Sequence, residues 1–505
     1  MLTNVLQYLE RTVLRVPDKL SYASEEMGLT FQELSQQARS VGTRLYRDGI
    51  YKKPVVVFMA KGPKTPAAFF GAIYAGNAYV PLDEEMPRHR MELIFETLQP
   101  AAIICDESTR AIAEEFDYHG KIYTYEEICE EPEDAAALSL VRAKQLDTDP
   151  VYIMFTSGST GVPKGVVACH RSVIDYIEHL TEIMRFNEGT VFGSQTPLYF
   201  DASMKEVYPT IQCGATTYFI PKQLFMFPVK LVEFLNRYRI NTICWVVSAL
   251  TMVSAFRAFE KVKPEFLHTI GFGGEVFPIK QYQIWRAALP HARFVNLYGP
   301  TEITGVCTYY EVDREFSLEE TLPIGFAFPN TEIILLDEND REPPLGEQGE
   351  ICVRGTGVTL GYYCNPEKTS EVFVQNPLNK CYPEIIYRTG DLAKYNARGE
   401  LVFVSRKDFQ VKHMGHRIEL GEIEAIVDKL DTVRRACCVF DGVKKKIALY
   451  YEGDISALEL TAYLKEKFPR YMVPSQVKQL DALPLSLNGK IDRKLLKQWY
   501  EENKI

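Results

Sequence analysis

Apolar and polar positions follow two different periods along this chain, and the two periods predict strands and helices. Pro54–Met59 is a short apolar run rich in valine, which is typical of a buried strand. Between Phe31 and Tyr46 apolar residues recur every three or four positions, at Leu34, Ala38, Val41 and Leu45, which predicts an amphipathic helix. Because strand-like and helix-like segments alternate, the sequence predicts an α/β fold.

Polar, glycine-rich segments follow several of the apolar runs. Val151–Met154 predicts a strand and leads into a loop at Ser157, and Thr269–Glu275 and Phe294–Thr301 have the same order. In α/β sheets, ligands bind beyond the carboxyl ends of the strands. We therefore expect functional residues of this chain in these loops.

The pattern changes near Ser405, where a second region with elements of its own begins. Two strands are predicted at Arg435–Phe440 and Lys446–Tyr451, and a helix at Ser456–Phe468. A chain of 505 residues is too long for a single hydrophobic core, so two or more domains are expected.

Composition excludes few classes of protein. The net charge of −10, from 57 basic and 67 acidic residues, argues against a general nucleic-acid-binding surface. The N-terminus lacks the pattern of a signal peptide, and the most apolar run, Ile243–Phe256, is too short to span a bilayer. The 11 cysteines form no CxxC pair and the 8 histidines no HxH spacing, so we expect reduced cysteines, no zinc site and a cytoplasmic protein.

The loop at residues 155–165, FTSGSTGVPKG, carries the clearest chemistry. Glycines let backbone N–H groups approach an anion, and hydroxyl groups and Lys164 add donors and positive charge, which suits a polyphosphate. The ordinary P-loop pattern is not met, because Pro163 precedes Lys164 and Gly165 follows it, so a P-loop kinase or GTPase is disfavoured. A surface turn rich in serine, threonine and glycine is the plain alternative.

This loop resembles the phosphate loop of the adenylate-forming superfamily, and further motifs extend the resemblance over the whole chain. Their order and spacing are similar to a stand-alone amino-acid adenylation domain of the non-ribosomal peptide synthetase or D-alanine–carrier protein ligase type. The motifs are Leu29–Leu34, Tyr79–Asp83, Phe200–Ser203, Asn296–Glu302, Tyr387–Asp391, Arg417–Glu422 and Asn488–Arg493.

The resemblance implies an architecture and a reaction. Residues 1–405 would form a large domain of sheets flanked by helices with a small β-barrel-like part, residues 406–408 a hinge centred on Asp408, and residues 409–505 a small mobile α+β domain. The enzyme would use ATP and Mg²⁺ to convert an amino acid to an aminoacyl-adenylate, releasing pyrophosphate. The acyl group would then pass to the phosphopantetheine thiol of a carrier protein in trans, and the enzyme would be a monomer.

The resemblance also assigns residues to the nucleotide. Lys490, Lys164, Thr301 and Glu302 would be catalytic, with Glu302 as the magnesium ligand, a role that suits a hard cation. Tyr298 would stack on adenine, Asn296 would read its amino edge, and Asp391 would accept both ribose hydroxyls. The full nucleotide set is Thr156, Ser157, Gly158, Ser159, Thr160, Gly161, Lys164, Gly274, Asn296, Tyr298, Gly299, Thr301, Asp391, Arg406 and Lys490.

The amino-acid pocket is the third set that the resemblance implies. Asp201 would bind the substrate α-ammonium, which fatty-acid and aryl-acid enzymes do not require. Lys205 indicates an acidic substrate side chain and Phe272 an apolar one, although Lys205 could instead pair with Glu206 or lay its stem along the wall. The set is Asp201, Ala202, Lys205, Ser248, Ile270, Phe272, Leu297, Gly305 and Val306.

Other functions stay open on the sequence alone. The segment around Phe200–Ser203 is similar to D-alanine-activating enzymes, but Gly273 stands where those have a cysteine. A carboxylate–CoA ligase is a second alternative, which Asp201 disfavours. A catalytically silent ATP-binding module is a third, and it would be favoured if Lys490, Glu302 or Asp391 were missing.

Overall fold

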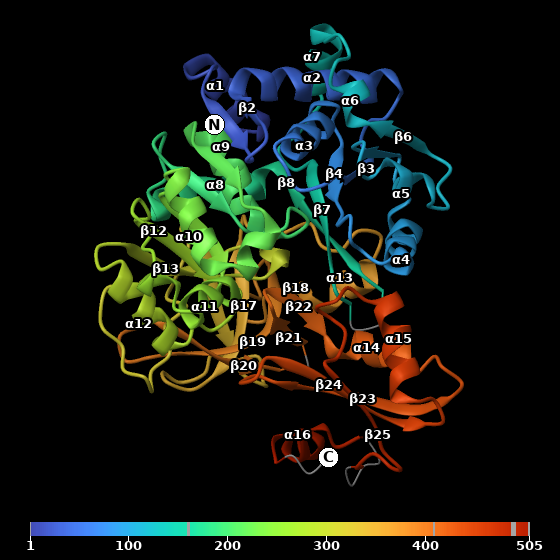
Figure 1. Cartoon of the computed structure of the whole chain (residues 1–505), viewed down its shortest axis with the longest axis vertical. Coiled ribbons are helices and arrows are strands. Elements are labelled where there is room, and N and C mark those ends of the chain that lie inside the picture. Colours follow the sequence, from blue (N-terminus) through green and yellow to red (C-terminus); the bar gives the residue numbers. More distant parts are fainter. Residues whose placement is uncertain (1, 159–161, 408–409, 486–490, 503–505) are drawn as a thin grey trace. The chain divides into compact units, whose positions relative to one another are not determined.

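A computed structural model describes residues 2–158, 162–407, 410–485 and 491–502 (Figure 1). The chain divides into two compact units. Unit 1 comprises Met1–Glu84, Leu98–Met154 and Gly165–Lys407, and unit 2 comprises Glu85–Thr97, Phe155–Lys164 and Asp408–Ile505. Within the described ranges, no helix has both the length and the apolar character needed to cross a membrane. The expected hinge residue Asp408 lies outside the described residues.

Unit 1 contains a six-stranded sheet whose central strands are parallel. Its order is β6-β5-β3-β4-β7-β8, and β3 pairs in parallel with both β4 and β5. Every residue of β3 is buried, as expected of a valine-rich strand covered on both faces. The strands are β3 (Pro54–Phe58), β4 (Ala78–Pro81), β5 (Ala102–Cys105), β6 (Lys121–Thr124), β7 (Pro150–Thr156) and β8 (Lys164–Cys169).

A nine-stranded sheet forms the second layer of unit 1, in the order β15-β14-β13-β12-β11-β9-β10-β1-β2. Its inner strands run parallel, and β14, β15 and β2 are antiparallel at the edges. The strands are β1 (Leu20–Ala23), β2 (Gly28–Thr30), β9 (Val191–Ser194), β10 (Thr216–Phe219), β11 (Thr242–Val246), β12 (Thr269–Gly273), β13 (Arg293–Tyr298), β14 (Thr308–Glu311) and β15 (Phe326–Ala327).

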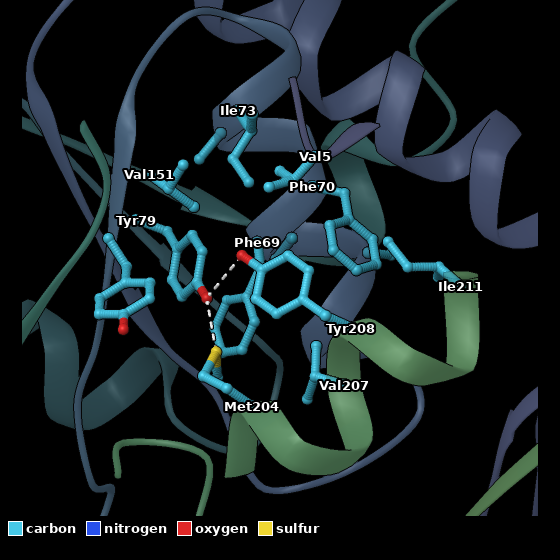
Figure 2. Packing of buried hydrophobic residues seen from close by; sticks show 14 of the residues in the cluster. Val5, Phe69, Phe70, Ile73, Tyr79, Val151, Met204, Val207, Tyr208 and Ile211 are labelled. Atoms are coloured by element: carbon cyan, nitrogen blue, oxygen red, sulfur yellow. Dashed lines mark hydrogen bonds between the residues drawn. The ribbon is translucent and has the colours of Figure 1, made fainter. Parts of the chain in front are cut away.

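Helices and one large hydrophobic cluster lie between these two sheets. The predicted helix is confirmed as α2, and Thr30 and Glu33 close its first turn with a capping box. It packs along α3 (Figure 1). In Figure 2, Tyr79 and Tyr208 meet in the cluster, where the Tyr79 hydroxyl lies 3.1 Å from that of Tyr208. The main helices are α1 (Leu6–Arg15), α2 (Phe31–Arg47), α3 (Lys64–Tyr74), α8 (His170–Met184) and α9 (Met204–Cys213).

The remaining helices of unit 1 include those on the outer side of the nine-stranded sheet. Side chains of α10, α11 and α12 form a second cluster there with Trp245 and Phe294. These helices are α5 (Arg110–Glu114), α6 (Tyr125–Ile128), α7 (Ala135–Arg142), α10 (Pro228–Arg237), α11 (Val247–Ala255), α12 (Ile279–Ala288) and α13 (Pro366–Val372), with short 3₁₀ turns η1 (Asp201–Ser203), η2 (Lys222–Met226), η3 (Ala258–Glu260) and η4 (Thr301–Ile303).

A five-stranded antiparallel sheet completes unit 1 and corresponds to the predicted barrel-like part. Its path is β16-β17-β19-β18, with β20 also paired to β19. The strands are β16 (Thr331–Leu336), β17 (Gly349–Gly355), β18 (Phe373–Gln375), β19 (Ile385–Tyr395) and β20 (Leu401–Arg406).

Unit 2 is α+β and has a hydrophobic cluster of its own, built on Ile423, Leu449 and Leu464. Strands β23 and β24 contain the two predicted strands, and Ser456 caps the predicted helix, α15. Its elements are α4 (Arg88–Leu98), β21 (Gln410–His413), β22 (His416–Glu419), α14 (Leu420–Val427), β23 (Val433–Asp441), β24 (Lys446–Gly453), α15 (Ala457–Lys467), β25 (Gln476–Gln479) and α16 (Arg493–Glu501). The α/β class is confirmed, whereas the mobility of this unit stays a prediction.

Candidate active site

A buried carboxylate on β19 is held by donors from two other strands. The hydroxyl of Tyr298, the last residue of β13, donates to one oxygen of Asp391 at 2.5 Å, and Arg406 donates to the other at 2.6 Å. Arg406 is the cross-strand neighbour of Asp391 on β20. The Asp391 side chain is 3% exposed, and an ion pair so deep must be hydrogen-bonded at both partners to be tolerated. The geometry therefore presents a fixed, negatively charged group.

The loop that follows β13 contains the segment Asn296–Glu302 and is tightly packed. The Asn296 amide donates to the Pro323 carbonyl at 2.7 Å. A Cβ on Gly299 would lie 2.4 Å from the Gly305 carbonyl oxygen, so only glycine fits there. Glu302 is fully buried, and the hydroxyl of Tyr362 donates to its carboxylate at 2.8 Å.

Asp201 opens the 3₁₀ turn η1, which continues directly into α9. Lys205 is four residues further on, a spacing that puts the two side chains on neighbouring positions of one helical face. Burial raises the pKa of Asp201, while Lys205, the Thr301 hydroxyl and the backbone N–H of Ala202 oppose that rise. One cation and two hydrogen-bond donors therefore offset part of the cost of burying a carboxylate at Asp201.

The two faces of β12 differ in what they contact. Ile270 and Phe272 belong to the outer hydrophobic cluster with Trp285. Leu297 belongs to the cluster between the sheets, and a Cβ on Gly271 would lie 3.4 Å from its Cδ1 atom and 3.1 Å from Cys244 Sγ.

The structure therefore brings Gly271, and not Ile270 or Phe272, to the face of the nine-stranded sheet on which Leu297 of β13 lies. Gly273 pairs with Leu297 in the parallel register and shares that face, because residues two apart on a strand point the same way. The alternation of glycine with Ile270 and Phe272 in the sequence is the signal that could have identified both glycines.

Several buried polar atoms on β7, β9 and α8 lack a hydrogen-bond partner among the described residues. They include the hydroxyls of Tyr152 and Tyr176 and the Ser194 hydroxyl. Burial raises the pKa of both tyrosines far above its usual range, and the negative charge of Asp201 adds to the rise in each. The two phenols are therefore neutral donors close to the Asp201 carboxylate, and the sequence patterns did not single them out.

The sequence-predicted residues are divided between the units. Unit 1 holds Asp201, Ala202, Lys205, Ser248, Ile270, Phe272, Gly274, Asn296, Leu297, Tyr298, Gly299, Thr301, Glu302, Gly305, Val306, Asp391 and Arg406. Unit 2 holds Thr156, Ser157, Gly158 and Lys164, whereas Ser159, Thr160, Gly161, Asp408 and Lys490 lie outside the described residues.

Two described members of the predicted phosphate loop are bonded within unit 2. The Ser157 hydroxyl donates to the Arg417 carbonyl at 2.7 Å. Burial raises the pKa of Glu422 overall; its ion-pair partner Arg90 opposes this rise most, and the backbone N–H of Gly158 and the charge of Lys164 add smaller effects. These N–H and ammonium groups already stabilise an anionic group.

Comparison with known proteins gives the chain a family. A family model described as AMP-binding enzyme matches residues 9–363. Tyrocidine synthase 3 of Brevibacillus parabrevis is 32% identical over 98% of this chain, and tyrocidine synthase 1 of the same organism is 30% identical over 98%. The chain spans only 8% and 45% of the lengths of these two relatives.

Solved structures agree in fold. The crystal structure of IdnL1 is 26% identical with a TM-score of 0.80 and covers 95% of this chain and 99% of its own. The Vibrio cholerae adenylation domain AlmE, in complex with glycyl-adenosine-5′-phosphate, has a TM-score of 0.85 at 20% identity over 99% of this chain and 98% of its own, a likeness of fold. The chain therefore belongs to the AMP-binding enzyme family.

Proposed function

We propose that this enzyme activates an amino acid as an aminoacyl-adenylate and transfers it to the phosphopantetheine thiol of a carrier protein in trans. The observation that carries the proposal is Asp201, a carboxylate stabilised beside Lys205 and Thr301 in the unit that also holds Asp391. A carboxylate in this place is the partner that an α-ammonium group requires. An enzyme for simple carboxylic acids gains nothing from it.

The nucleotide would be bound by Asn296, Tyr298, Asp391 and Arg406. Each oxygen of Asp391 already accepts one hydrogen bond, and each keeps further lone-pair capacity for a ribose hydroxyl. Gly274 supports close approach of a nucleotide, because its φ is +84° and a Cβ there would meet only Val246, at 4.0 Å. These residues fit ATP as the second substrate.

Glu302 is the residue that would hold Mg²⁺. Its carboxylate is oriented by the Tyr362 hydroxyl, as metal-binding carboxylates usually are. Mg²⁺ commonly takes one or two protein carboxylates together with substrate phosphates, which a single glutamate suits. When bound, the ion would supply positive charge to the phosphate oxygens.

The chemistry requires positive charge because two anions must meet. The substrate carboxylate oxygen forms a bond to the α-phosphorus of ATP, the bond from that phosphorus to the bridging oxygen breaks, and pyrophosphate leaves with the bond electrons. Lys164 and the hydroxyls of Thr156 and Ser157 would stabilise the pyrophosphate, Thr301 the α-phosphate, and Lys490 the reacting oxygens.

In the second step the thiolate of the carrier attacks the acyl carbon and AMP leaves. Domain rotation about Asp408 would exchange Lys490 for the Lys412–Arg417 segment. That a carrier is the acceptor is supported by the similarity in fold to adenylation proteins with carrier domains, such as holo-PA1221 at a TM-score of 0.83 and 21% identity.

Amino-acid-dependent exchange of labelled pyrophosphate into ATP tests the first step. We expect exchange with a narrow subset of the common amino acids, and none with their des-amino analogues. Asp201→Ala should raise the amino acid's KM about 10- to 100-fold and reduce the discrimination against des-amino analogues, because one charge-assisted hydrogen bond is lost. Asp313→Ala, at a partly exposed carboxylate outside the proposed site, is the control.

The acceptor needs a separate assay. A carboxylate–CoA ligase also has a similar fold, since o-succinylbenzoate CoA synthetase of Bacillus subtilis matches with a TM-score of 0.83 at 20% identity. Incubation with ATP, amino acid and either CoA or a phosphopantetheinylated carrier separates the two acceptors by mass spectrometry of the thioester. A thioester formed on CoA alone would refute transfer to a carrier.

A further inference from the structure

Two lysines and two acids interact by charge close to the proposed α-ammonium site, and among the described residues none of the four forms an ion pair at contact distance. Lys205 and Glu206 are consecutive residues in the first turn of α9, 7% and 1% exposed. Lys61 donates a hydrogen bond to the Ser194 carbonyl at 3.0 Å. Buried lysine and glutamate without partners are costly, so each member of this cluster needs a counter-charge.

Lys61 is the main counter-charge of Glu206. Burial raises the pKa of Glu206 to about 7, and the cations that oppose this are Lys61 first and Lys205 second. Burial lowers the pKa of Lys61 to about 8, and Glu206 is the first of the acids that oppose it. Both carboxylate oxygens of Glu206 nevertheless lack a hydrogen-bond partner among the described residues, so Lys61 acts on Glu206 through its charge alone.

Lys205 interacts by charge with both acids of the cluster, Asp201 and Glu206. Among the residues that the structure describes, its ammonium makes no hydrogen bond, and no carboxylate oxygen lies within the 4.0 Å of an ion pair. Its side chain therefore does not pair with Glu206 at contact distance, which was one of the alternatives for this residue. The acid that most depends on its charge is Asp201, for which Lys205 is the first stabilising influence.

Binding of an amino acid changes this balance. An α-ammonium at Asp201 neutralises the carboxylate that Lys205 compensates in the free protein. If the substrate side chain were neutral, the buried cluster would then hold three cations, Lys61, Lys205 and the α-ammonium, against two acids, which is unfavourable. A carboxylate on the substrate side chain would restore the balance and would bind Lys205 through a charge-assisted hydrogen bond.

The walls of the site are compatible with such a side chain. Figure 2 shows Met204, Val207, Tyr208 and Ile211 of α9 directed into the hydrophobic cluster. Lys205 follows Met204 by one position, about 100° around the helix, and so lies on a different face. Gly271 and Gly305 contribute no side-chain bulk beside Leu297 and Tyr176.

From this charge arrangement we infer that the amino acid activated by this enzyme carries a side-chain carboxylate, which Lys205 binds while Asp201 binds the α-ammonium. The inference rests on the proposed amino-acid activation. Aspartate and glutamate are the two lengths to compare. Glycine, alanine and other neutral amino acids are excluded by the same reasoning.

Pyrophosphate exchange with isosteric pairs tests this inference. For the unaltered enzyme we expect kcat/KM for glutamate over glutamine, or for aspartate over asparagine, to exceed about 10 because one side of each pair lacks the charge. Lys205→Met keeps the stem and removes the charge, and it should bring that ratio close to 1. Lys261→Met, at an exposed lysine, is the matched control and should leave the ratio unchanged.

The outcomes separate the two proposals. Exchange with neutral amino acids only, or an acid-to-amide ratio that survives Lys205→Met, would overturn the acidic substrate and leave amino-acid activation standing. Exchange with no amino acid would overturn both. Should Lys205→Met fail to fold, as judged by its thermal unfolding, the acid-to-amide ratio of the unaltered enzyme decides alone.

Discussion

The proposed nucleotide residues and the proposed amino-acid residues of unit 1 differ in how fully their polar groups are satisfied. Asp391 is held by Tyr298 and Arg406 at hydrogen-bond distance before any ligand arrives. Beside Asp201, by contrast, Lys205 and the hydroxyls of Tyr152 and Tyr176 have no such partners among the described residues. A pre-formed site loses little conformational entropy when its ligand binds. Buried polar groups without hydrogen-bond partners instead favour only a ligand that supplies the missing hydrogen bonds.

This difference fits the two kinds of ligand. AMP-binding enzymes use ATP, so the residues proposed to bind it would serve every member of the family. The amino acid must be chosen among many similar molecules, and a buried group left unpaired by the wrong substrate is an effective means of rejection. Substitutions in the proposed nucleotide site and in the proposed amino-acid site test this contrast separately.

The largest effect is expected from Lys490→Ala, which removes the cation proposed to act on both ligands at once. Adenylate formation should slow about 10²- to 10³-fold because the developing charge loses one electrostatic partner. ATP binding, measured by calorimetry, should change much less. Lys494→Ala, four residues later and exposed on α16, is the matched control. Equal exchange rates for Lys490→Ala and the unaltered enzyme would remove Lys490 from the mechanism.

Asp391→Asn should weaken the proposed nucleotide site, whose polar groups are already hydrogen-bonded. The change leaves Arg406, whose side chain is 11% exposed, without its anionic partner, and breaking a buried pair costs about 3 kcal/mol of unfolding free energy. The KM for ATP should rise, while the ratio of KM values between amino acids should stay constant. Denaturant unfolding and steady-state exchange measure the two effects.

An exposed ion pair supplies the control for that variant. Asp340 pairs with Arg388 and its side chain is 51% exposed. Asp340→Asn should therefore cost no more than about 1 kcal/mol. Equal losses for Asp340→Asn and Asp391→Asn would mean that burial does not strengthen the Asp391 pair.

Glu206→Gln tests the charge cluster beside Asp201 through the pH dependence of the unfolding free energy. The pKa of Glu206 is raised to about 7 in the folded protein. At pH values between the ordinary pKa of a glutamate and 7, the folded state therefore binds a proton at Glu206 that the unfolded state has released. Stability contributed by this group is therefore present at low pH and falls as pH rises toward 7, by at most about 1.4 kcal/mol per pH unit. Unfolding free energies at several pH values should show a decline that Glu206→Gln reduces. Parallel curves for the two proteins would contradict a raised pKa.

The sequence predicted local structure well where local interactions determine it. Helix α2 starts at its capping box and β3 coincides with a run of valines, because both depend on neighbours in the chain. The motif order also indicated the family. The charge interaction of Lys61 with Glu206 could not be predicted, since it depends on how strands from two sheets pack around α9.

The pocket residues on β12 illustrate a finer limit. Side chains of a strand alternate between its faces, so an alignment shifted by one residue exchanges the whole set. Ile270 and Phe272 were assigned to the pocket from sequence, yet both lie in the outer cluster, and Gly271 and Gly273 share the face of Leu297. Motif order identifies such a segment but does not by itself fix which of its faces meets the ligand.

Paired substitutions on β12 make the smallest and most specific test. Gly271→Ala places a methyl group 3.0 Å from Met184 Cε and 3.1 Å from Cys244 Sγ, which crowds the inner face at a cost of about 1 kcal/mol. It should also raise KM for the amino acid without changing KM for ATP. Ile270→Val removes one methylene from the outer cluster and should cost a similar amount of stability, about 0.5–1.5 kcal/mol, with no change in either KM. The two variants are matched in stability. If Ile270→Val alone changed the amino acid's KM, the amino-acid pocket would lie on the outer face of β12, with Ile270, and not on the face with Gly271.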